Sequence, residues 1–163
     1  MIAELLTSAE RVGLDLWLRG GWAMDFFLGE FTRPHGDVDW FAWAQDVDRL
    51  TELLLGLGYV SVDGPPPEQQ RDFARDGEEH AFAFLATNSA GQVVVAGGPW
   101  AGEPWPDGML DAEPGRLGEY AAPIIAARAQ LEIKEMMPVW VPGRPRRAKD
   151  IADIAVLRAE LAE

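Results

Sequence analysis

The sequence predicts an α/β (α+β) fold in which a mixed β-sheet is flanked by helices. Three observations support this prediction. Helix-like and strand-like segments alternate through the first 62 residues, a run of strand-like segments follows, and two helical segments close the chain. Such segments bury their apolar sides when helices pack on the faces of a sheet. With 163 residues, the chain is long enough for one domain with a substantial core.

The first half of the chain is expected to alternate between helices and strands. Apolar residues recur at helical spacing over residues 2–12, and Asp37–Trp43 alternates with period two, as a half-buried strand does. Residues 15–19 form a short apolar run that meets two glycines, which predicts a strand ending in a turn. The other predicted elements are a helix over 22–28 capped by Gly29, a helix from Asp46 to Leu57, and a strand over 58–62.

The second half is expected to contain strands and then two helices. Gly64–Pro67 interrupts the chain, and strands are predicted at Phe73 and over residues 80–85 and 92–96, the last two joined by a hairpin turn. Residues 97–118 are rich in Gly and Pro and predict a long loop. A helix over 126–136 should end before Pro138, and a final helix should span 146–161.

The composition narrows the class of partner. The chain has 14 Lys and Arg residues against 27 Asp and Glu residues, a formal net charge of −13. An acidic surface repels phosphate backbones and anionic lipid, so nucleic acid and membrane are not expected as partners, whereas a metal ion or a cationic small molecule is. Cysteine is absent, which excludes disulfides, zinc-thiolate sites and a cysteine nucleophile. Without a signal peptide or a long apolar run, a cytoplasmic location is expected.

Two acidic residues and two glycines predict the chemistry. Asp37 and Asp39 point to one face of the predicted strand, where two carboxylates can share a hard cation such as Mg²⁺. Gly20 and Gly21 lie between a strand and a helix, where backbone N–H groups can approach a triphosphate. Taken alone, the acids could be solvated residues and the glycines a plain turn. Their combination favours phosphoryl or nucleotidyl transfer, which depends on positioning and charge stabilisation.

The same stretch resembles the active-site motif of the DNA polymerase beta-like nucleotidyltransferase superfamily. The similarity is strongest to its small-molecule branch, which includes the aminoglycoside 2''-adenylyltransferases and lincosamide nucleotidyltransferases. It is strong over residues 14–43, weak through the middle, and returns at Gln130 and at Lys149–Asp153. The motif residues are Gly20, Gly21, Trp22, Ala23, Asp25, Gly29, Thr32, Arg33, His35, Asp37, Val38 and Asp39. The resemblance implies a nucleotidyltransferase-like fold.

The resemblance also implies roles for individual residues. Gly20 and Gly21 would contact the triphosphate, and Asp37 and Asp39 would bind Mg²⁺. Arg33 and Lys149 are candidate phosphate-binding cations.

Each of these cations has a structural alternative. Arg33 could form a salt bridge with Asp25, and Lys149 could be an exposed residue at a helix end. His35 is expected to order the loop rather than to catalyse.

This sequence departs from the family pattern at the third carboxylate. Relatives carry it on a later strand, where it completes the metal site or accepts the proton of the acceptor. Glu79 lies at the expected distance from Asp39 and is our candidate, ahead of Glu78 and Asp76. Glu79 could instead be an exposed turn residue. Without a third acid, the protein would bind nucleotide and turn over slowly or not at all.

We therefore expect transfer of a nucleoside monophosphate, AMP from Mg·ATP, to a hydroxyl of a small molecule, with aminoglycosides and lincosamides as candidate acceptors. The alternative is a catalytically weak or inactive nucleotide-binding or interaction module; a third option is an enzyme that modifies protein side chains. One domain is expected, with its core in residues 1–97 and the acceptor side in 98–163. Trp100 and Trp105 should line the acceptor pocket, a homodimer could complete it, and the acids of Glu103–Glu119 could receive a polyamine.

Overall fold

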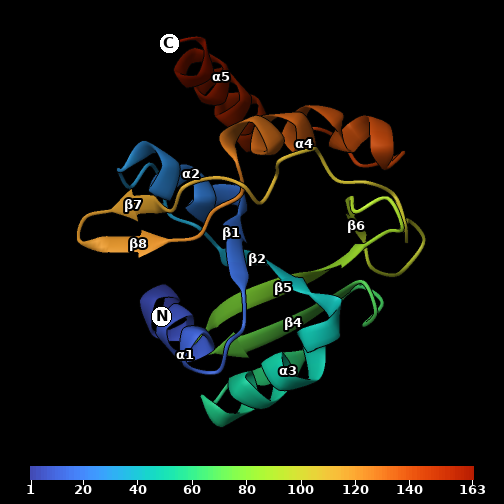
Figure 1. The fold of residues 1–163 in the computed structure, drawn as a ribbon. Helices are drawn as coiled ribbons and strands as arrows, with labels where there is room; N and C mark the ends of the chain where they lie inside the picture. Colours follow the sequence, from blue (N-terminus) through green and yellow to red (C-terminus); the bar gives the residue numbers. More distant parts are fainter.

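The computed structural model describes all 163 residues and contains a six-stranded mixed sheet (Figure 1). The strands follow the order β1-β2-β5-β4-β3, and β6 pairs with β5. Only the pairing of β2 with β5 is parallel. The strands are β1 (Leu16–Arg19), β2 (Asp37–Trp43), β3 (Val60–Val62), β4 (Gln70–Arg75), β5 (Glu78–Thr87) and β6 (Val93–Val95).

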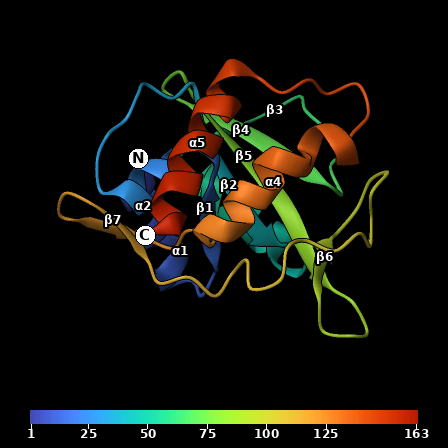
Figure 2. The same ribbon diagram turned by 90° about the horizontal axis from the view of Figure 1, so that it is seen from above.

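Five α-helices surround this sheet, so the predicted fold class is confirmed. In Figure 1, α1 and α3 lie at the lower end of the molecule and α4 and α5 at the opposite end. Seen from above, α4 and α5 cover the sheet (Figure 2). The helices are α1 (Ile2–Arg11), α2 (Gly20–Leu28), α3 (Val47–Gly56), α4 (Ala127–Trp140) and α5 (Ala148–Ala162). None combines the length and the apolar composition that a bilayer crossing requires.

Successive side chains of β2 point to opposite faces of the sheet and belong to two different hydrophobic clusters. Val38, Trp40 and Ala42 belong to the main core, which also contains residues of α1 and α3. Phe41 instead belongs to a second cluster with residues of α4 and the segment before it. Because side chains alternate along a strand, Asp37 and Asp39 share the face of Phe41, the face that α4 covers.

The predicted loop over 97–118 ends in a hairpin that the sequence did not reveal. Its strands are β7 (Gly115–Leu117) and β8 (Tyr120–Ala122). A Cβ atom at Gly115 would lie 2.8 Å from the backbone oxygen of Phe26, so the hairpin packs closely against α2. Strands of three residues carry too little periodicity to be recognised without this tertiary contact.

The expectation that Pro138 ends the second-last helix was wrong. Pro138 lies inside α4, which continues to Trp140. A proline removes one intrahelical N–H, but the helix resumes, because the Val141 N–H donates to the Met137 carbonyl at 2.9 Å. The continuation places Trp140 on the same helix as Gln130 and Lys134.

Candidate active site

The turn between β1 and α2 is built around Gly20. Its φ of +68° lies in the left-handed region, and an added Cβ would lie 2.9 Å from Oδ2 of Asp39. Gln130 of α4 holds the peptide: the Gly20 N–H donates to Oε1 at 3.2 Å, and Nε2 donates to the Gly20 carbonyl at 2.6 Å. The Gly20 N–H is thus occupied. The N–H groups left for a ligand belong to the following residues, because no side chain caps α2.

Gly21 makes room for the loop that precedes β2. An added Cβ at Gly21 would lie 2.3 Å from Nδ1 of His35. His35 Nε2 lies 2.7 Å from Oδ2 of the fully buried Asp25, and the Thr32 hydroxyl donates to Oδ1 of Asp25 at 2.6 Å. Asp25 therefore anchors this loop to α2 at two points, Thr32 and His35, which agrees with a loop-ordering role for His35.

The alternative considered for Arg33, a salt bridge with Asp25, is not the contact that forms. Arg33 binds Asp153 of α5 with two hydrogen bonds of 2.8 and 3.0 Å. Asp25 is already occupied by the two contacts from its own loop, whereas Asp153 is 97 % buried and needs cationic partners. Lys134 is the second partner, with Nζ 2.9 Å from Oδ2 of Asp153. These ion pairs join the loop, α4 and α5.

Asp150 extends this ion-pair network towards the start of α5. Arg147 donates from Nε to Oδ2 of Asp150 at 2.8 Å, and Lys134 Nζ lies 3.5 Å from Oδ1. Burial works against ionisation of Asp150, but the hydrogen bonds from Arg147 and the charge of Lys134 lower its pKa to about 2. Asp150 thus remains ionised and balances part of the surrounding positive charge.

The strand register defines how the predicted carboxylates lie. Asp37 is paired with Glu79 across the parallel β2–β5 pair, and both are exposed. Asp39 is half-buried and paired with Arg19 across β1 and β2. No three or more His, Asp or Glu side chains lie close enough together to hold a metal ion. The structure thus offers two carboxylates, Asp37 and Asp39, with Glu79 beside Asp37 on the next strand.

Asp39 is the most perturbed of these carboxylates. Burial raises its pKa, opposed by the positive charge of Arg19, and the nearby negative charge of Asp37 raises it further. A cation bound between Asp37 and Asp39 would relieve this repulsion. Mg²⁺ is commonly held by one or two carboxylates and completed by substrate phosphates and water, so this pair fits the ion.

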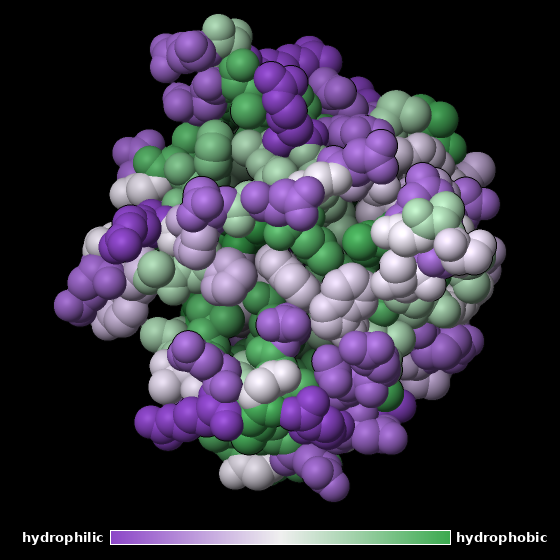
Figure 3. Space-filling view, in the orientation of Figure 1, coloured by the Kyte–Doolittle hydropathy of each residue, from purple (hydrophilic) through white to green (hydrophobic).

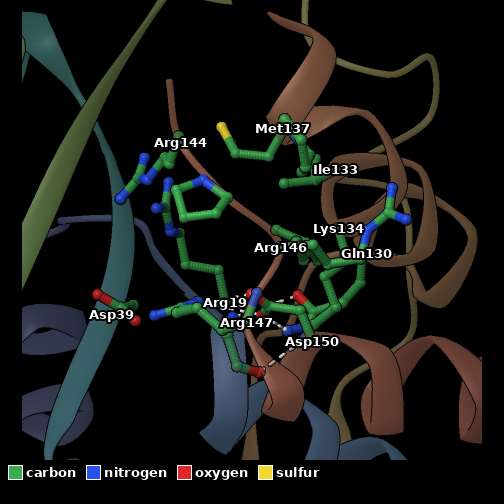
Figure 4. Close-up of a pocket in the computed structure, with 14 residues that line it drawn as sticks. Arg19, Asp39, Gln130, Ile133, Lys134, Met137, Arg144, Arg146, Arg147 and Asp150 are labelled. Atoms are coloured by element: carbon green, nitrogen blue, oxygen red, sulfur yellow. Dashed lines mark hydrogen bonds and ion pairs between the residues drawn. The ribbon is translucent and has the colours of Figure 1, made fainter. Parts of the chain in front are cut away.

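Asp39 faces a cavity of about 320 Å³ that we call the cationic cleft. In Figure 4, Asp39 lies on β2 at one side of the cleft, and Ile133, Lys134 and Met137 of α4 lie across from it. Despite the acidic composition of the chain, only Asp39 and Asp150 contribute negative charge to its lining. The basic residues in the lining are Arg19, Lys134, Arg144, Arg146 and Arg147.

Sequence reasoning missed all five of these cations. The cluster of arginines in Gly143–Arg147 and the arginine directly before the glycine pair were visible signals. Of the predicted site residues, Gly20 and Asp39 line the cleft. The others do not: Gly21, Arg33, Asp37, Glu79 and Lys149. Lys149 is exposed and forms no ion pair, and its charge acts on Asp39.

A second cavity, of about 510 Å³, adjoins the first; we call it the aromatic pocket. Trp100 and Trp105 line it, as expected for a pocket wall, and its role as the acceptor pocket stays a prediction. Trp140 is a third tryptophan in its wall, brought there by the continuation of α4 beyond Pro138. The two cavities share three residues: Arg19, Met137 and Arg144.

Comparisons with known proteins agree with this arrangement. A 2''-aminoglycoside nucleotidyltransferase of Klebsiella pneumoniae is 29 % identical over 128 residues, which cover 78 % of this chain. A protein of the same description from Escherichia coli is equally similar. The matched region spans only 63 % of the length of these relatives.

Solved structures share the fold. The crystal structure of ANT(2'')-Ia in complex with adenylyl-2''-tobramycin has a TM-score of 0.77 at 19 % identity, covering 96 % of this chain and 85 % of that one. The lincomycin-bound lincosamide antibiotic adenylyltransferase LnuA has a TM-score of 0.74 at 20 % identity, covering 95 % and 92 %. The fold is therefore a nucleotidyltransferase-like α+β fold, as the motif resemblance implied.

The family comparison covers almost the whole chain. The sequence profile described as aminoglycoside-2''-adenylyltransferase matches residues 1–157. That range includes the glycine turn, the paired aspartates of β2 and the ion-pair network of α4 and α5. The chain belongs to the aminoglycoside-2''-adenylyltransferase family.

Proposed function

We propose that the protein transfers a nucleoside monophosphate, AMP from Mg·ATP, to a hydroxyl group of a small molecule. The observation that carries this proposal is the position of Asp39 at the edge of a cleft lined by five basic side chains. Nucleotidyl transfer needs a hard-metal site beside a phosphate site, since its catalysis is mostly positioning and charge stabilisation. Family membership supports the same reaction.

In this proposal, Asp37 and Asp39 would hold Mg²⁺, which when bound neutralises negative charge on the phosphates. Arg144 is exposed and its side chain has no ion-pair partner, so it is available to bind phosphate oxygens. Lys149 is also exposed and without an ion pair, but it lies outside the lining of the cleft, and we propose it as a further phosphate-binding cation. Arg33 is held by Asp153, and we propose that it acts by fixing α5 rather than by direct phosphate contact.

The acceptor hydroxyl oxygen would attack the α-phosphorus, forming one P–O bond as the bond to pyrophosphate breaks. Glu79 is our candidate to take the hydroxyl proton, because it is exposed and lies beside Asp37 in the register. The acceptor side of the domain is expected in residues 98–163, which supply Trp100, Trp105 and Trp140 to the aromatic pocket.

The test uses the Asp37→Asn and Asp39→Asn variants with Asp48→Asn as the control. Asp48 is an exposed aspartate on α3, outside both cavities. Thermal unfolding with Mg²⁺ and each of ATP, GTP, CTP and UTP measures binding, because a ligand of the folded state raises Tm. We expect Mg·ATP to raise the Tm of the parent and of the control by several degrees. The rise should be much smaller in the Asp37→Asn and Asp39→Asn variants.

Turnover is measured as transfer of labelled AMP to candidate acceptors. Each active-site variant should lose at least about 100-fold in rate, since each removes a charge that acts in the transition state. An Asp39→Asn protein with parental turnover would refute the assignment. Nucleotide binding without transfer to any acceptor would favour the inactive nucleotide-binding module.

A further inference from the structure

Gln130 of α4 joins two elements that are far apart in the sequence and meet at the cationic cleft. Its carboxamide binds both main-chain polar groups of Gly20: Oε1 accepts from the N–H at 3.2 Å, and Nε2 donates to the carbonyl at 2.6 Å. Gln130 is only 4 % exposed, so water competes little for these bonds. A buried carboxamide that satisfies both groups of one residue fixes the orientation of that residue.

The fold attaches α4 to the sheet without this side chain. The segment before α4 runs beside β1, where the Leu18 N–H donates to the Pro123 carbonyl at 2.8 Å and the Ile125 N–H donates to the Leu18 carbonyl at 3.1 Å. Ile125 and Ala129 also pack in the second hydrophobic cluster, on the face of the sheet that α4 covers. Since these contacts dock the helix, the effect of the Gln130 carboxamide falls on the turn that it holds.

The bond to the Gly20 carbonyl sets the direction of the next N–H group. The chain has no cis peptide bond, and the carbonyl and N–H of a trans peptide point in opposite directions. Because the Gly20 carbonyl points to Gln130, the Gly21 N–H points away from α4. This N–H lies at the start of α2, where the first N–H groups have no intrahelical partner, and no loop carbonyl accepts from it. Gln130 thus determines where a free donor of the glycine turn points.

Gly20 lies between Gln130 and Asp39. On the side of β2, its backbone is so close to Asp39 that an added Cβ would lie 2.9 Å from Oδ2. In Figure 4, Asp39 and Gln130 lie on opposite sides of the cleft, and both line it. A rotation of the Gly20 backbone would therefore move the free N–H relative to the carboxylate that we propose as a Mg²⁺ ligand.

We propose that Gln130 is a positioning residue for the nucleotide: by holding Gly20, it directs the Gly21 N–H to a phosphate bound beside Asp39. Backbone N–H groups at the start of a helix bind phosphate more tightly when they are oriented in advance, because the ligand then does not have to order them. Gln130 acts through Gly20 and does not itself contact the phosphates. This inference rests on the proposed function and adds the residue that prepares its phosphate site.

The test compares Gln130→Met with two control variants. Methionine is similar in length to glutamine and forms neither hydrogen bond. It suits its surroundings, because Ile133 and Met137 line the cleft on the same helix and hydrophobic side chains lie in the hollow below α4 (Figure 3). Gln92→Met makes the same change at an exposed position between β5 and β6, outside both cavities. Leu50→Ala removes contacts of the main core on α3, so it lowers stability without changing the turn.

Calorimetric titration measures Kd for Mg·ATP and for Mg·tripolyphosphate, which carries phosphates without a nucleoside. Circular dichroism checks that each variant is folded at the temperature of the titration. We expect Gln130→Met to weaken both ligands by the same factor, at least about tenfold, as for the loss of a hydrogen bond to a charged group. Both controls should change either Kd less than about twofold, because their sites are distant from the turn.

Nuclear magnetic resonance separates positioning from a general loss of stability. Saturation with Mg·tripolyphosphate should shift the amide signal of Gly21 in the parent and equally in Leu50→Ala. In Gln130→Met we expect a much smaller shift at saturation, together with faster hydrogen exchange of the Gly20 N–H, which has lost its acceptor.

Parental Kd values in Gln130→Met would overturn the inference. So would weaker binding of Mg·ATP alone, which would place the defect at the nucleoside, or a Gly21 signal that bound Mg·tripolyphosphate leaves unmoved in the parent. If Gln130→Met does not fold, Gln130→Asn decides with the same measurements, because its side chain is one methylene shorter and cannot reach both atoms of Gly20. A parent that binds no Mg·NTP overturns the proposed function as well, whereas equal binding by parent and variant overturns this inference alone.

Discussion

Arg19 and Asp39 are paired across β1 and β2, yet no hydrogen bond or ion pair joins their side chains. Burial lowers the pKa of Arg19 and raises that of Asp39, while the charge of each partner opposes these shifts. The guanidinium group of Arg19 lies over the Phe41 ring, and Arg19 lines both cavities. Arg19, which lines both cavities, and Asp39, which lines the cleft, thus remain separately available for a ligand.

The close contact of Gly21 with His35 predicts that Gly21→Ala is destabilising. A Cβ atom 2.3 Å from Nδ1 forces His35 to move and disturbs its bond to the buried Asp25. We expect a loss of about 1–3 kcal/mol in unfolding free energy, measured by urea denaturation. Gly36→Ala is the control, because nothing lies within 4 Å of its added Cβ. Equal stability of the two variants would contradict this account.

The ion pairs of Asp153 predict a large effect of Asp153→Ala. The change leaves Arg33 and Lys134 without their shared buried carboxylate, and such losses typically cost about 3–5 kcal/mol. Chemical denaturation measures the change. The matched control on the same helix is Glu160→Ala, at an exposed position without an ion pair. A cost below about 1 kcal/mol for Asp153→Ala would mean that this network does not stabilise the fold.

Because His80 is buried, we predict that the folded protein loses stability in mild acid. Its side chain is fully buried, and burial, helped by the positive charges of the N-terminus and Arg75, lowers its pKa to about 4. Between pH 6.5 and pH 4 the unfolded chain binds a proton at this site that the folded chain does not. The unfolding free energy therefore falls as the pH falls, by up to about 3 kcal/mol from this residue.

The measurement is urea denaturation across this pH range for the parent and for His80→Gln. The glutamine oxygen can accept the hydrogen that Trp40 Nε1 now donates to Nδ1 of His80 at 3.0 Å. We expect the slope of stability against pH between 6.5 and 4 to be smaller in the variant. Parallel curves would show that His80 does not contribute to the slope.

Because Pro138 lies inside α4, we predict that replacing it with alanine stabilises the protein. Pro138→Ala restores an N–H to the interior of α4, and alanine is favoured over proline in a helix by about 3 kcal/mol. Part of this gain is offset because proline also restricts the unfolded chain, so we expect a rise of about 1–2 kcal/mol. Thermal unfolding measures it, with Pro142→Ala, beyond the helix, as the control. A lower Tm for Pro138→Ala would show that the helix needs the proline geometry.

The local pattern of the sequence was sufficient for the elements next to the site. Strand β2 has the bounds that its period-two alternation predicted, and Gly29 ends α2 with a φ of +75°. The glycine turn and the strand that carries Asp37 and Asp39 were predicted for the same reason, since a turn and a strand face are defined by residues a few positions apart. The metal-binding roles of the two aspartates stay predictions. The homodimer, the cytoplasmic location and the role of Glu79 stay predictions.

The tertiary structure alone decided which distant charges meet. Arg33 pairs with Asp153, 120 positions away, rather than with Asp25, because the neighbours of Asp25 had already filled its oxygens. The net charge of −13 likewise suggested a cationic ligand, yet the cleft beside Asp39 is lined mainly by basic residues. Composition sums charge over the whole chain, whereas a ligand responds to the few side chains that the packing of α4 and α5 on the sheet brings within its reach.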